Sequence, residues 1–558
     1  MLALAAVIGA ASGLAIVAFY GSVDLVQVGV RSAAGWIGAE EAARWSPLLV
    51  LPLGLIAARW LRRPEDRERG GTMIPQLIVS AAGRGGDLGA RRVGRGLLSA
   101  AVTLGTGGPL GSEGPVALAG GTVGSMAGRL FGFRPGRVKV LLACGAAAGI
   151  SAAFHAPIAG VMFALEIVLG SFAVVALTPV IVASVLGAVV SRVYLGGTPA
   201  FQVPTEFALA SVPQLGFYVL LALGTGLLSI VFVRGFYWIQ DLLGRLPDRR
   251  VLAPVVAGIL VAAGGLLYPE LSGPGREGIQ LMLFGQLAGA SALLLGLMKI
   301  VASGLTMGGG GAGGVFTPSL FVGAGFGSFF GLTLQQLLPG LGVSPGAFAL
   351  VGMAGLLAGS TAAPLTAILI VFEMTGDYGL ILPLMLVCVL SYLTADRLSG
   401  ESLYSVALDR QGEKIRHGVD LSVLQSVRVA ECYDRDPVTL RRESPFRDIL
   451  SALRESGQLD FPVVSEDGRL AGVISYQQLA RALAEKELAD LLVAADLMME
   501  EPEKVEPDDS LLLAMQRMSA RDLDFIPVVE AGDEGRLVGL LRRADIMETY
   551  QAHLMLPD

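Results

Sequence analysis

An acidic residue set among glycines offers the clearest chemistry in this sequence. The run Gly111-Ser112-Glu113-Gly114-Pro115 lies in a long apolar region with few charges. A carboxylate at membrane depth is costly, so it marks an ion or proton pathway by default. Glycine allows close approach of the backbone to a ligand, and a helix beginning here would direct its N–H groups at an anion. We expect Glu113 to compete with that anion for one positive helix end and thus to act as a gate.

Three other segments could direct polar groups at the same anion. Glycine and proline mark predicted helix starts in Gly71-Thr72-Met73-Ile74-Pro75 and in Gly314-Val315-Phe316-Thr317-Pro318, and Ser402-Leu403-Tyr404-Ser405 supplies a phenol. Each helix start carries about half a positive charge on free N–H groups. Such partial charges hold an anion without trapping it, which conduction requires. The predicted anion contacts are Thr72, Gly111, Ser112, Gly114, Val315, Phe316 and Tyr404.

The elements that must position these residues are membrane helices. The 558 residues are 53% hydrophobic and 16% charged, with 75 glycines and a mean hydropathy of +0.64. Soluble domains average about 25% charged residues, so this composition indicates an integral membrane protein. Many apolar stretches are shorter than a full span or are broken by Gly or Pro, which favours broken helices around a midplane site. The net charge of −7 does not indicate nucleic acid as a partner.

The membrane part contains an internal duplication. His155-Ala156-Pro157 is repeated as Ala362-Ala363-Pro364, 207 positions later, and the same offset relates Gly145 to Gly352 and Glu166 to Glu373. A second segment repeats at nearly the same offset, 203 positions, and its pairs are Pro115 and Pro318, Gly120 and Gly323, Gly124 and Gly327, and Ser125 and Ser328. This agreement predicts two related halves. We expect Glu166 and Glu373 to cap or bond neighbouring helices.

The chain from about Glu413 onward has the charge content of a soluble domain and its own repeat. Asp460-Phe461-Pro462-Val463-Val464 is echoed by Phe525-Ile526-Pro527-Val528-Val529, and each unit pairs short β-branched runs with a helical segment, Leu479–Ala489 or Leu511–Ala520. This alternation predicts two α/β units. Cys144, Cys388 and Cys432 show no metal-ligand or disulfide spacing, so no metal site is expected.

The motifs resemble those of the CLC chloride channels and proton/chloride antiporters over most of residues 1–410. Glu113 matches the family's gating glutamate, Phe316 lies in its G-x-F-x-P element, and Tyr404 matches its anion-facing tyrosine. Phe154-His155-Ala156-Pro157 resembles the F-N-A-P stretch. The resemblance implies an all-α, polytopic membrane domain of inverted repeats with broken and re-entrant helices. It also implies a homodimer in which each subunit has its own pore.

Five positions depart from the family pattern. Met73 stands where glycine is usual and could narrow the inner mouth, whereas Thr72 keeps the hydroxyl of the usual serine. Ser112 replaces an Arg or Lys before the gate and removes a positive charge. His155 replaces asparagine. Ile167 stands where many antiporters have a proton-accepting glutamate, which weakens the argument for proton coupling without ending it.

The tail resembles the paired CBS domains of many family members, which implies regulation or dimer stabilisation. The resemblance also makes adenine nucleotide a candidate ligand through a Ser/Thr-x-x-Asp pattern. Here each unit keeps half of that pattern, Ser475 in the first and Asp545 in the second. Neither transport nor folding is expected to require a cofactor.

The sequence therefore predicts a transmembrane anion-transport domain over 1–410, a linker over 411–429, and CBS domains over 430–490 and 491–552. Arginine-rich loops around Thr72 place that side and the tail in the cytoplasm by the positive-inside rule, in a multi-pass protein of the cell membrane. The predicted function is proton-coupled chloride antiport, with Glu113 as gate and proton carrier. A passive anion channel is the alternative. A cation transporter would need clustered carboxylates in the membrane part, and this sequence has only scattered ones there. The histidines and cysteines are not arranged as a catalytic site.

Overall fold

A computed structural model of the chain describes residues 1–36, 45–62, 73–83, 85–197, 201–203, 207, 213–248, 250–376, 378–413, 424, 427–456, 458–484, 492–500, 502–520 and 523–555. The chain divides into two compact units, residues 1–418 and 419–558. The first unit is helical, as predicted, and the second is mixed α/β. Most of the predicted linker, residues 414–423 and 425–426, lies outside the described residues.

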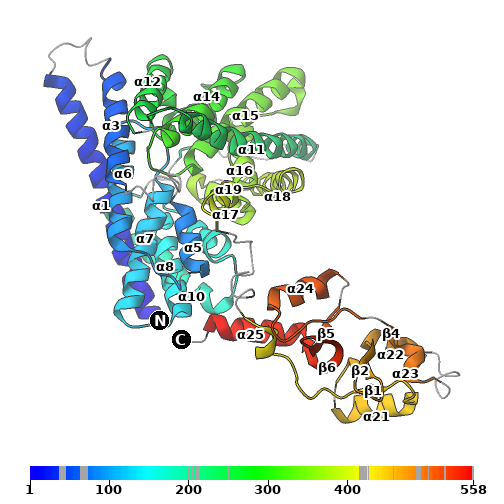
Figure 1. The fold of residues 1–558 in the computed structure, drawn as a ribbon. Helices are drawn as coiled ribbons and strands as arrows, with labels where there is room; N and C mark the ends of the chain where they lie inside the picture. Colours follow the sequence, from blue (N-terminus) through cyan, green and yellow to red (C-terminus); the bar gives the residue numbers. More distant parts are fainter. Residues whose placement is uncertain are drawn as a thin grey trace. The chain divides into compact units, whose positions relative to one another are not determined.

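The helices of the first unit form one array in which the long α1 lies along an edge (Figure 1). They are α1 (Leu2–Trp36), α3 (Pro47–Leu61), α5 (Ile74–Gly83), α6 (Ala90–Gly105), α7 (Glu113–Leu130), α8 (Pro135–Phe154), α9 (Pro157–Phe163), η1 (Ala164–Leu169), α10 (Val174–Leu195), α11 (Gln214–Gly244), α12 (Leu252–Leu267), η2 (Pro269–Leu271), α13 (Arg276–Leu283), α14 (Ala290–Gly308), α15 (Phe316–Leu337), η3 (Pro339–Leu341), α16 (Pro345–Thr361), α17 (Pro364–Thr375), α18 (Ile381–Leu398) and α19 (Leu403–Arg410).

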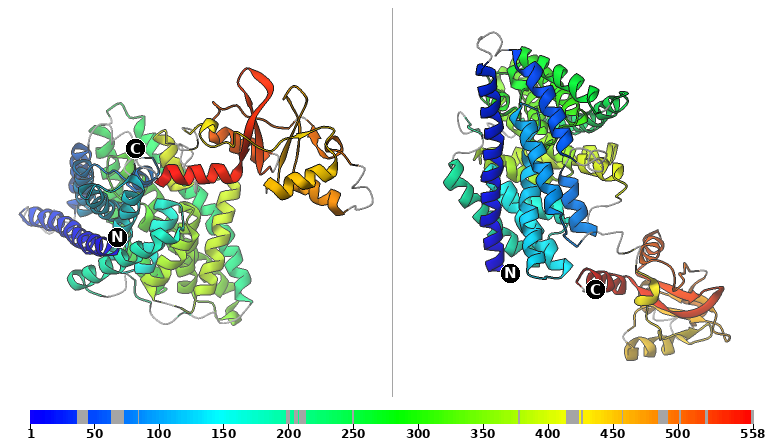
Figure 2. Two further views of the ribbon diagram at one scale, coloured as in Figure 1. Left: turned by 90° about the horizontal axis from the view of Figure 1, so that it is seen from below. Right: turned by 60° about the vertical axis from the view of Figure 1, so that its left-hand side comes forward.

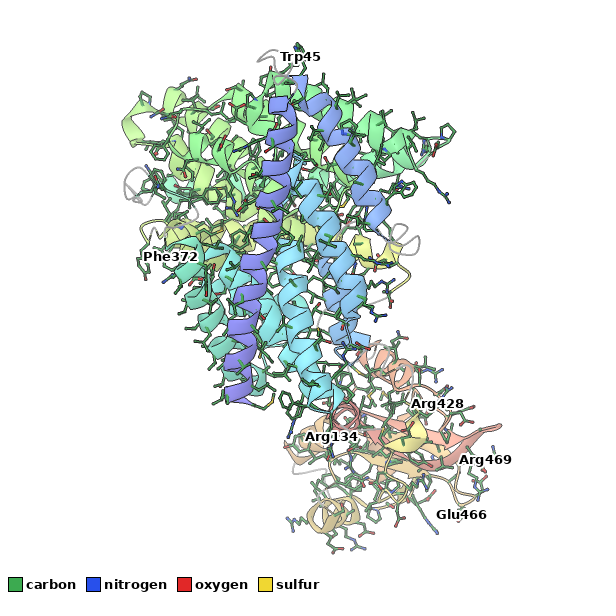
Figure 3. The ribbon with its side chains drawn as sticks, turned by 90° about the vertical axis from the view of Figure 1, so that its left-hand side faces the viewer. Trp45, Arg134, Phe372, Arg428, Glu466 and Arg469 are labelled. Carbon is green, nitrogen blue, oxygen red and sulfur yellow. The ribbon has the colours of Figure 1, made fainter. Side chains whose placement is uncertain are left out.

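The surface of the first unit suits a bilayer. Among the described residues, seven helices are long and apolar enough to cross a membrane, and α3, α9 with η1, α12, α16 and α17 are shorter apolar helices. Trp45 lies at one end of the unit and Arg134 at the other (Figure 3). Large apolar side chains are exposed on α1, α10 and α11, and α1 lies at the edge of the unit in both views of Figure 2. The predicted mixture of long and broken spans is thus confirmed.

Close glycine contacts confirm the internal duplication. Helix α7 packs on α8 where a Cβ added at Gly145 would lie 2.0 Å from the carbonyl oxygen of Gly120. Helix α15 packs on α16 at the related pair, where a Cβ at Gly352 would lie 2.5 Å from the oxygen of Gly323. No side chain fits at either crossing. Glycine therefore allows the two helix backbones to come into direct contact in both pairs.

The repeated Ala-Pro turns have the same backbone. His155 and Ala362 end α8 and α16 with φ of +56°, and they are the non-glycine residues with positive φ among those described. The next residue has nearly the same conformation in each half (φ −119° and ψ 78° at Ala156, φ −134° and ψ 74° at Ala363), and Pro157 and Pro364 then start α9 and α17 at the position where proline is best tolerated. A left-handed residue thus reverses the chain at the same point of each half.

Each half caps a helix of the other. The Glu373 carboxylate accepts hydrogen bonds from the N–H groups of Ile158 (3.1 Å) and Ala159 (2.7 Å) at the start of α9. The Glu166 carboxylate accepts bonds from the N–H groups of Leu365 (3.1 Å) and Thr366 (2.6 Å) at the start of α17, and from the Thr366 hydroxyl at 2.6 Å. The predicted capping role of both glutamates is confirmed, and the caps are exchanged between halves.

The second unit contains two strand–helix modules, as the repeat predicts. The first has a sheet in the order β1-β2-β3-β4, in which β1 and β2 are parallel and the other neighbours antiparallel; the second has an antiparallel β5-β6 pair. The elements of the second unit are η4 (Val429–Glu431), β1 (Leu440–Arg441), α21 (Phe446–Ser456), β2 (Phe461–Val464), β3 (Leu470–Ile474), α22 (Tyr476–Ala484), α23 (Ala494–Leu497), β4 (Met499–Glu500), α24 (Leu511–Ala520), β5 (Phe525–Glu530), β6 (Asp533–Arg542) and α25 (Arg543–Met555).

Candidate anion and proton site

Two helix starts, one from each half, meet at Glu113. Helix α7 begins at Glu113 itself and α15 begins at Phe316. The residues just before them are joined by two backbone hydrogen bonds, from Gly111 N–H to the Gly314 oxygen (2.8 Å) and from Gly314 N–H to the Gly111 oxygen (2.7 Å). The positive ends of two helices therefore face a common point, as predicted from the glycine-rich segments.

The Glu113 carboxylate occupies that point. A Cβ added at Gly111 would lie 1.8 Å from Glu113 Oε2, and one at Gly314 would lie 2.5 Å from the same atom. We call this space, bounded by Gly111, Gly314 and the Glu113 carboxylate, the anion seat. Both glycines are required here because any side chain would fill the seat.

The two carboxylate oxygens differ in their partners. The Thr317 hydroxyl donates a hydrogen bond to Glu113 Oε1. Oε2 is buried and accepts a hydrogen bond from no described residue. The side chain as a whole is fully buried. A buried, half-satisfied carboxylate is costly, and it is the group that a competing anion or a proton could most readily replace.

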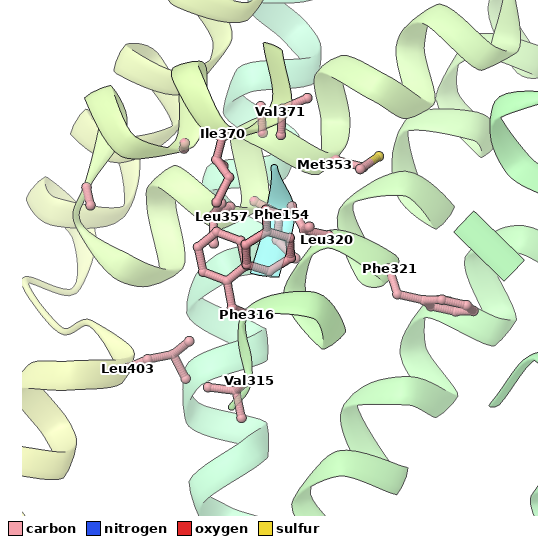
Figure 4. Close-up of a cluster of buried hydrophobic side chains, with 14 of the residues drawn as sticks. Phe154, Val315, Phe316, Leu320, Phe321, Met353, Leu357, Ile370, Val371 and Leu403 are labelled. Atoms are coloured by element: carbon pink, nitrogen blue, oxygen red, sulfur yellow. The ribbon is translucent and has the colours of Figure 1, made fainter. Parts of the chain in front are cut away.

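Aromatic and apolar side chains surround the start of α15. The Phe316 ring lies 5.9 Å from the Phe154 ring, centroid to centroid, and Val315 and Leu403 lie nearby (Figure 4). Tyr404, on α19, is buried, and its phenol lies within electrostatic range of Glu113. The structure thus brings together Gly111, Glu113, Val315, Phe316 and Tyr404 from three distant parts of the sequence.

The other predicted contacts have different outcomes. The Ser112 hydroxyl is bonded to the phenol of Tyr20 on α1, at 3.0 Å, so that it is already partnered. Gly114 faces Met73, because a Cβ at Gly114 would lie 3.4 Å from the Met73 Cβ. Thr72 lies outside the described residues. Met73 is buried at the start of α5, directly beside the segment that carries Glu113.

Sequence reasoning missed two residues of the site. Thr317 was part of a motif but was given no role, and its hydroxyl turns out to hold the gate carboxylate. Tyr20 lies in the first apolar helix and bonds Ser112 across 92 positions. A hydroxyl one residue after Phe316 was a usable signal for Thr317. Nothing in the local sequence indicated Tyr20.

Ile167 has no proton-accepting capacity and is buried in the π-helical segment η1. Its neighbour Glu166 is engaged by three donors of α17. No cluster of three or more metal-ligating side chains occurs among the described residues.

The nucleotide candidates of the second unit lie at helix starts. The Ser475 N–H donates to the Gln478 side-chain oxygen (2.7 Å), and the Arg542 N–H donates to Asp545 Oδ2 (3.1 Å). Gln478 and Asp545 thus perform the same capping role at α22 and α25. The Asp545 carboxylate is partly used by its own backbone.

Comparison with known proteins agrees with this geometry. The pattern of the voltage gated chloride channel family matches residues 50–396, and that of the CBS domain matches residues 429–485 and 493–552. The chain is 34% identical over 423 residues to a protein of Salmonella arizonae named H(+)/Cl(-) exchange transporter ClcA; the match covers 74% of this chain and 88% of the relative.

Two solved structures show the same architecture. One is a slow cyanobacterial Cl-/H+ antiporter, 25% identical with a TM-score of 0.67, matched over 74% of this chain and 97% of the other. The other is a eukaryotic CLC transporter, 22% identical with a TM-score of 0.64, matched over 98% and 97%. The chain belongs to the voltage gated chloride channel (CLC) family and carries a pair of CBS domains after its membrane unit.

Proposed function

We propose that this protein exchanges chloride for protons across a membrane, with Glu113 as both gate and proton carrier. The observation that carries the proposal is the Glu113 carboxylate lying in a seat formed by two helix starts, with Oε2 lacking a hydrogen-bond partner among the described residues. Relatives whose names include proton and chloride exchange support antiport as the function.

The mechanism follows from competition for the seat. An ionised Glu113 and a chloride ion are both anions, and both are attracted to the positive ends of α7 and α15. Protonation of Glu113 removes its charge and weakens its hold on the positive helix ends. The neutral side chain then leaves and chloride enters, so that proton binding and chloride binding become linked. Tyr404 and the Phe316 ring line the approach.

Reversal-potential measurements test the coupling. The full chain is reconstituted into vesicles with a chloride gradient, with and without a proton gradient. Antiport predicts that the reversal potential shifts when the proton gradient is changed, because protons move with chloride. Glu113→Gln cannot release a proton and is expected to give passive flux that is insensitive to pH. An unmodified protein whose reversal potential ignores the proton gradient would refute antiport.

A passive chloride channel is the second candidate. Ile167 favours it because the position after Glu166 offers no carboxylate to relay protons. A channel predicts that the reversal potential follows the chloride gradient alone. If the unmodified protein behaves so and Glu113→Gln still loses its pH dependence, Glu113 is a gate without being a proton carrier.

We further propose that the protein works as a homodimer with a pore in each subunit, in the cell membrane, with the CBS pair in the cytoplasm. Exposed apolar side chains on α10 (Ile181, Val185, Val189) and α18 (Leu382, Met385, Val389) recur every three or four residues and support lateral packing.

The CBS pair regulates transport in this proposal, and adenine nucleotide is its candidate ligand through Ser475 and Asp545. Calorimetric titration of ATP and AMP into the full chain and Asp545→Ala tests that ligand. An enzymatic activity is not proposed.

A further inference from the structure

A buried lysine holds the turn between α12 and α13. Lys299, on α14, is fully buried, and its Nζ donates hydrogen bonds to the carbonyl oxygens of Leu271 (2.9 Å) and Gly273 (2.8 Å). The same Nζ lies 5.1 Å from the centroid of the Phe321 ring. A buried amino group is costly unless its N–H groups find acceptors in this manner. The turn is therefore fixed to α14 by interactions that cannot be exchanged for water.

The same turn is bonded to the segment that leads into Glu113. The Gly273 N–H donates to the Gly107 oxygen at 2.9 Å. One helical turn beyond Lys299, the Ser303 hydroxyl donates to the Pro109 oxygen, also at 2.9 Å. Helix α14 thus holds both the turn and residues 107–109. As a result, whatever follows the turn is placed in a constant position relative to the anion seat.

The residue that follows the turn is Arg276, the first of α13. Gly275 before it has a φ of +86°, and a Cβ there would lie 2.7 Å from Phe321 Cδ2 and 2.9 Å from Lys299 Nζ. Only glycine fits, so the direction in which α13 starts is set by close packing. The Arg276 side chain itself is exposed.

Arg276 lies close to the segment that leads into Glu113. The turn that it follows is bonded through the Gly273 N–H to the Gly107 oxygen, six residues before Glu113, and its guanidinium lies within electrostatic range of the Glu113 carboxylate. Arg276 takes part in none of the ion pairs found between described residues, so its charge stays available. Ser112, next to the gate, carries no charge.

We propose that Arg276 is the residue that attracts anions to the Glu113 end of the route, and that the Lys299-bound turn holds it there. This inference rests on the proposed function. An exposed cation beside a buried seat raises the local anion concentration without occupying the seat itself. The arginine supplies from α13 the positive charge that Ser112 does not supply from within the gate motif.

Chloride uptake by vesicles containing the full chain tests the proposal. Attraction between unit charges about 10 Å apart, at an effective dielectric constant of about 40–80, corresponds to a roughly two- to fourfold change in local chloride concentration. Arg276→Gln should therefore raise the chloride concentration for half-maximal uptake roughly two- to fourfold at low ionic strength. The difference should shrink when gluconate salt raises ionic strength to about 0.15 M, where charges are screened beyond about 8 Å.

Two further variants separate charge from packing. Arg276→Lys should keep the unmodified half-maximal concentration, whereas Arg276→Glu should exceed the effect of Arg276→Gln. Arg250→Gln removes an exposed arginine from the connection between α11 and α12 and should change nothing. An Arg276→Gln protein with unmodified half-maximal concentration and salt dependence would overturn this inference while leaving the proposed function intact. If the unmodified chain moves no chloride, both fail.

Discussion

Replacing Glu373 tests how much the exchanged helix caps stabilise the membrane unit. Its carboxylate accepts two backbone hydrogen bonds at the start of α9, at 3.1 and 2.7 Å, and Ala159 at this start is fully buried. Hydrogen bonds to charged groups contribute about 1.5–3 kcal/mol each, and leaving a buried N–H unpaired costs about 1–3 kcal/mol. Because water can replace the partner of the exposed Ile158 but not that of Ala159, we expect Glu373→Ala to lower the free energy of unfolding by about 2–4 kcal/mol. Glu373→Gln keeps one acceptor and should lose about 1–2 kcal/mol.

Unfolding of the full chain in mixed dodecyl maltoside and sodium dodecyl sulfate micelles measures these differences. Glu166→Ala should show a loss at least as large, since Glu166 accepts from three donors on α17. Thr366→Val is the matched control, because it removes the hydroxyl donor and keeps both backbone bonds, so it should lose only about 1 kcal/mol. If both alanine variants unfold within about 0.5 kcal/mol of the unmodified chain, the caps are not structural and the reasoning is wrong.

The remaining predictions concern the seat and the tail. Gly314→Ala places a Cβ 2.5 Å from Glu113 Oε2, so chloride binding measured by calorimetry should be lost while size-exclusion behaviour is kept; retained binding would mean that the seat lies elsewhere. Thr317→Val removes the hydroxyl that holds Glu113, so half-maximal uptake should need less chloride, and an increase would show that the hydroxyl serves the anion instead. In the tail, burial raises the pKa of the Asp460 carboxyl, and the nearby Asp524 adds to the effect. A raised folded-state pKa gives stability that is present below the unfolded value of about 3.9 and lost as pH rises through the folded-state pKa. Asp460→Asn should therefore protect β2 from hydrogen exchange more than the unmodified chain at about pH 7 and equally at about pH 3; equal exchange at both would contradict this.

The sequence predicts those parts of the site that depend on local motifs. The glycine and proline residues around Glu113 predict that a helix begins there. The repeated Ala-Pro turns predict two related halves. The capping role of Glu166 and Glu373 also followed from their repeated positions. In each case the residue type and the backbone requirement lie within a few positions of one another.

Contacts between distant elements could not be predicted in this way. The Tyr20–Ser112 bond joins residues 92 positions apart, and the Thr317 hydroxyl reaches Glu113 across 204 positions. Lys299 lies in an apolar helix, and its partners are backbone carbonyl groups, which every residue has. Backbone acceptors and single hydroxyls carry no pattern that a sequence can display, although they decide what the site binds.

The exchange of caps between the halves has a consequence for the origin of the fold. Residues 157–159 begin a helix whose cap is supplied from position 373, and residues 364–366 begin one whose cap comes from position 166. A half-length ancestor with one such helix and one such glutamate could satisfy neither by itself. Two copies facing each other satisfy both, so the two halves of this chain depend on each other for these helix starts.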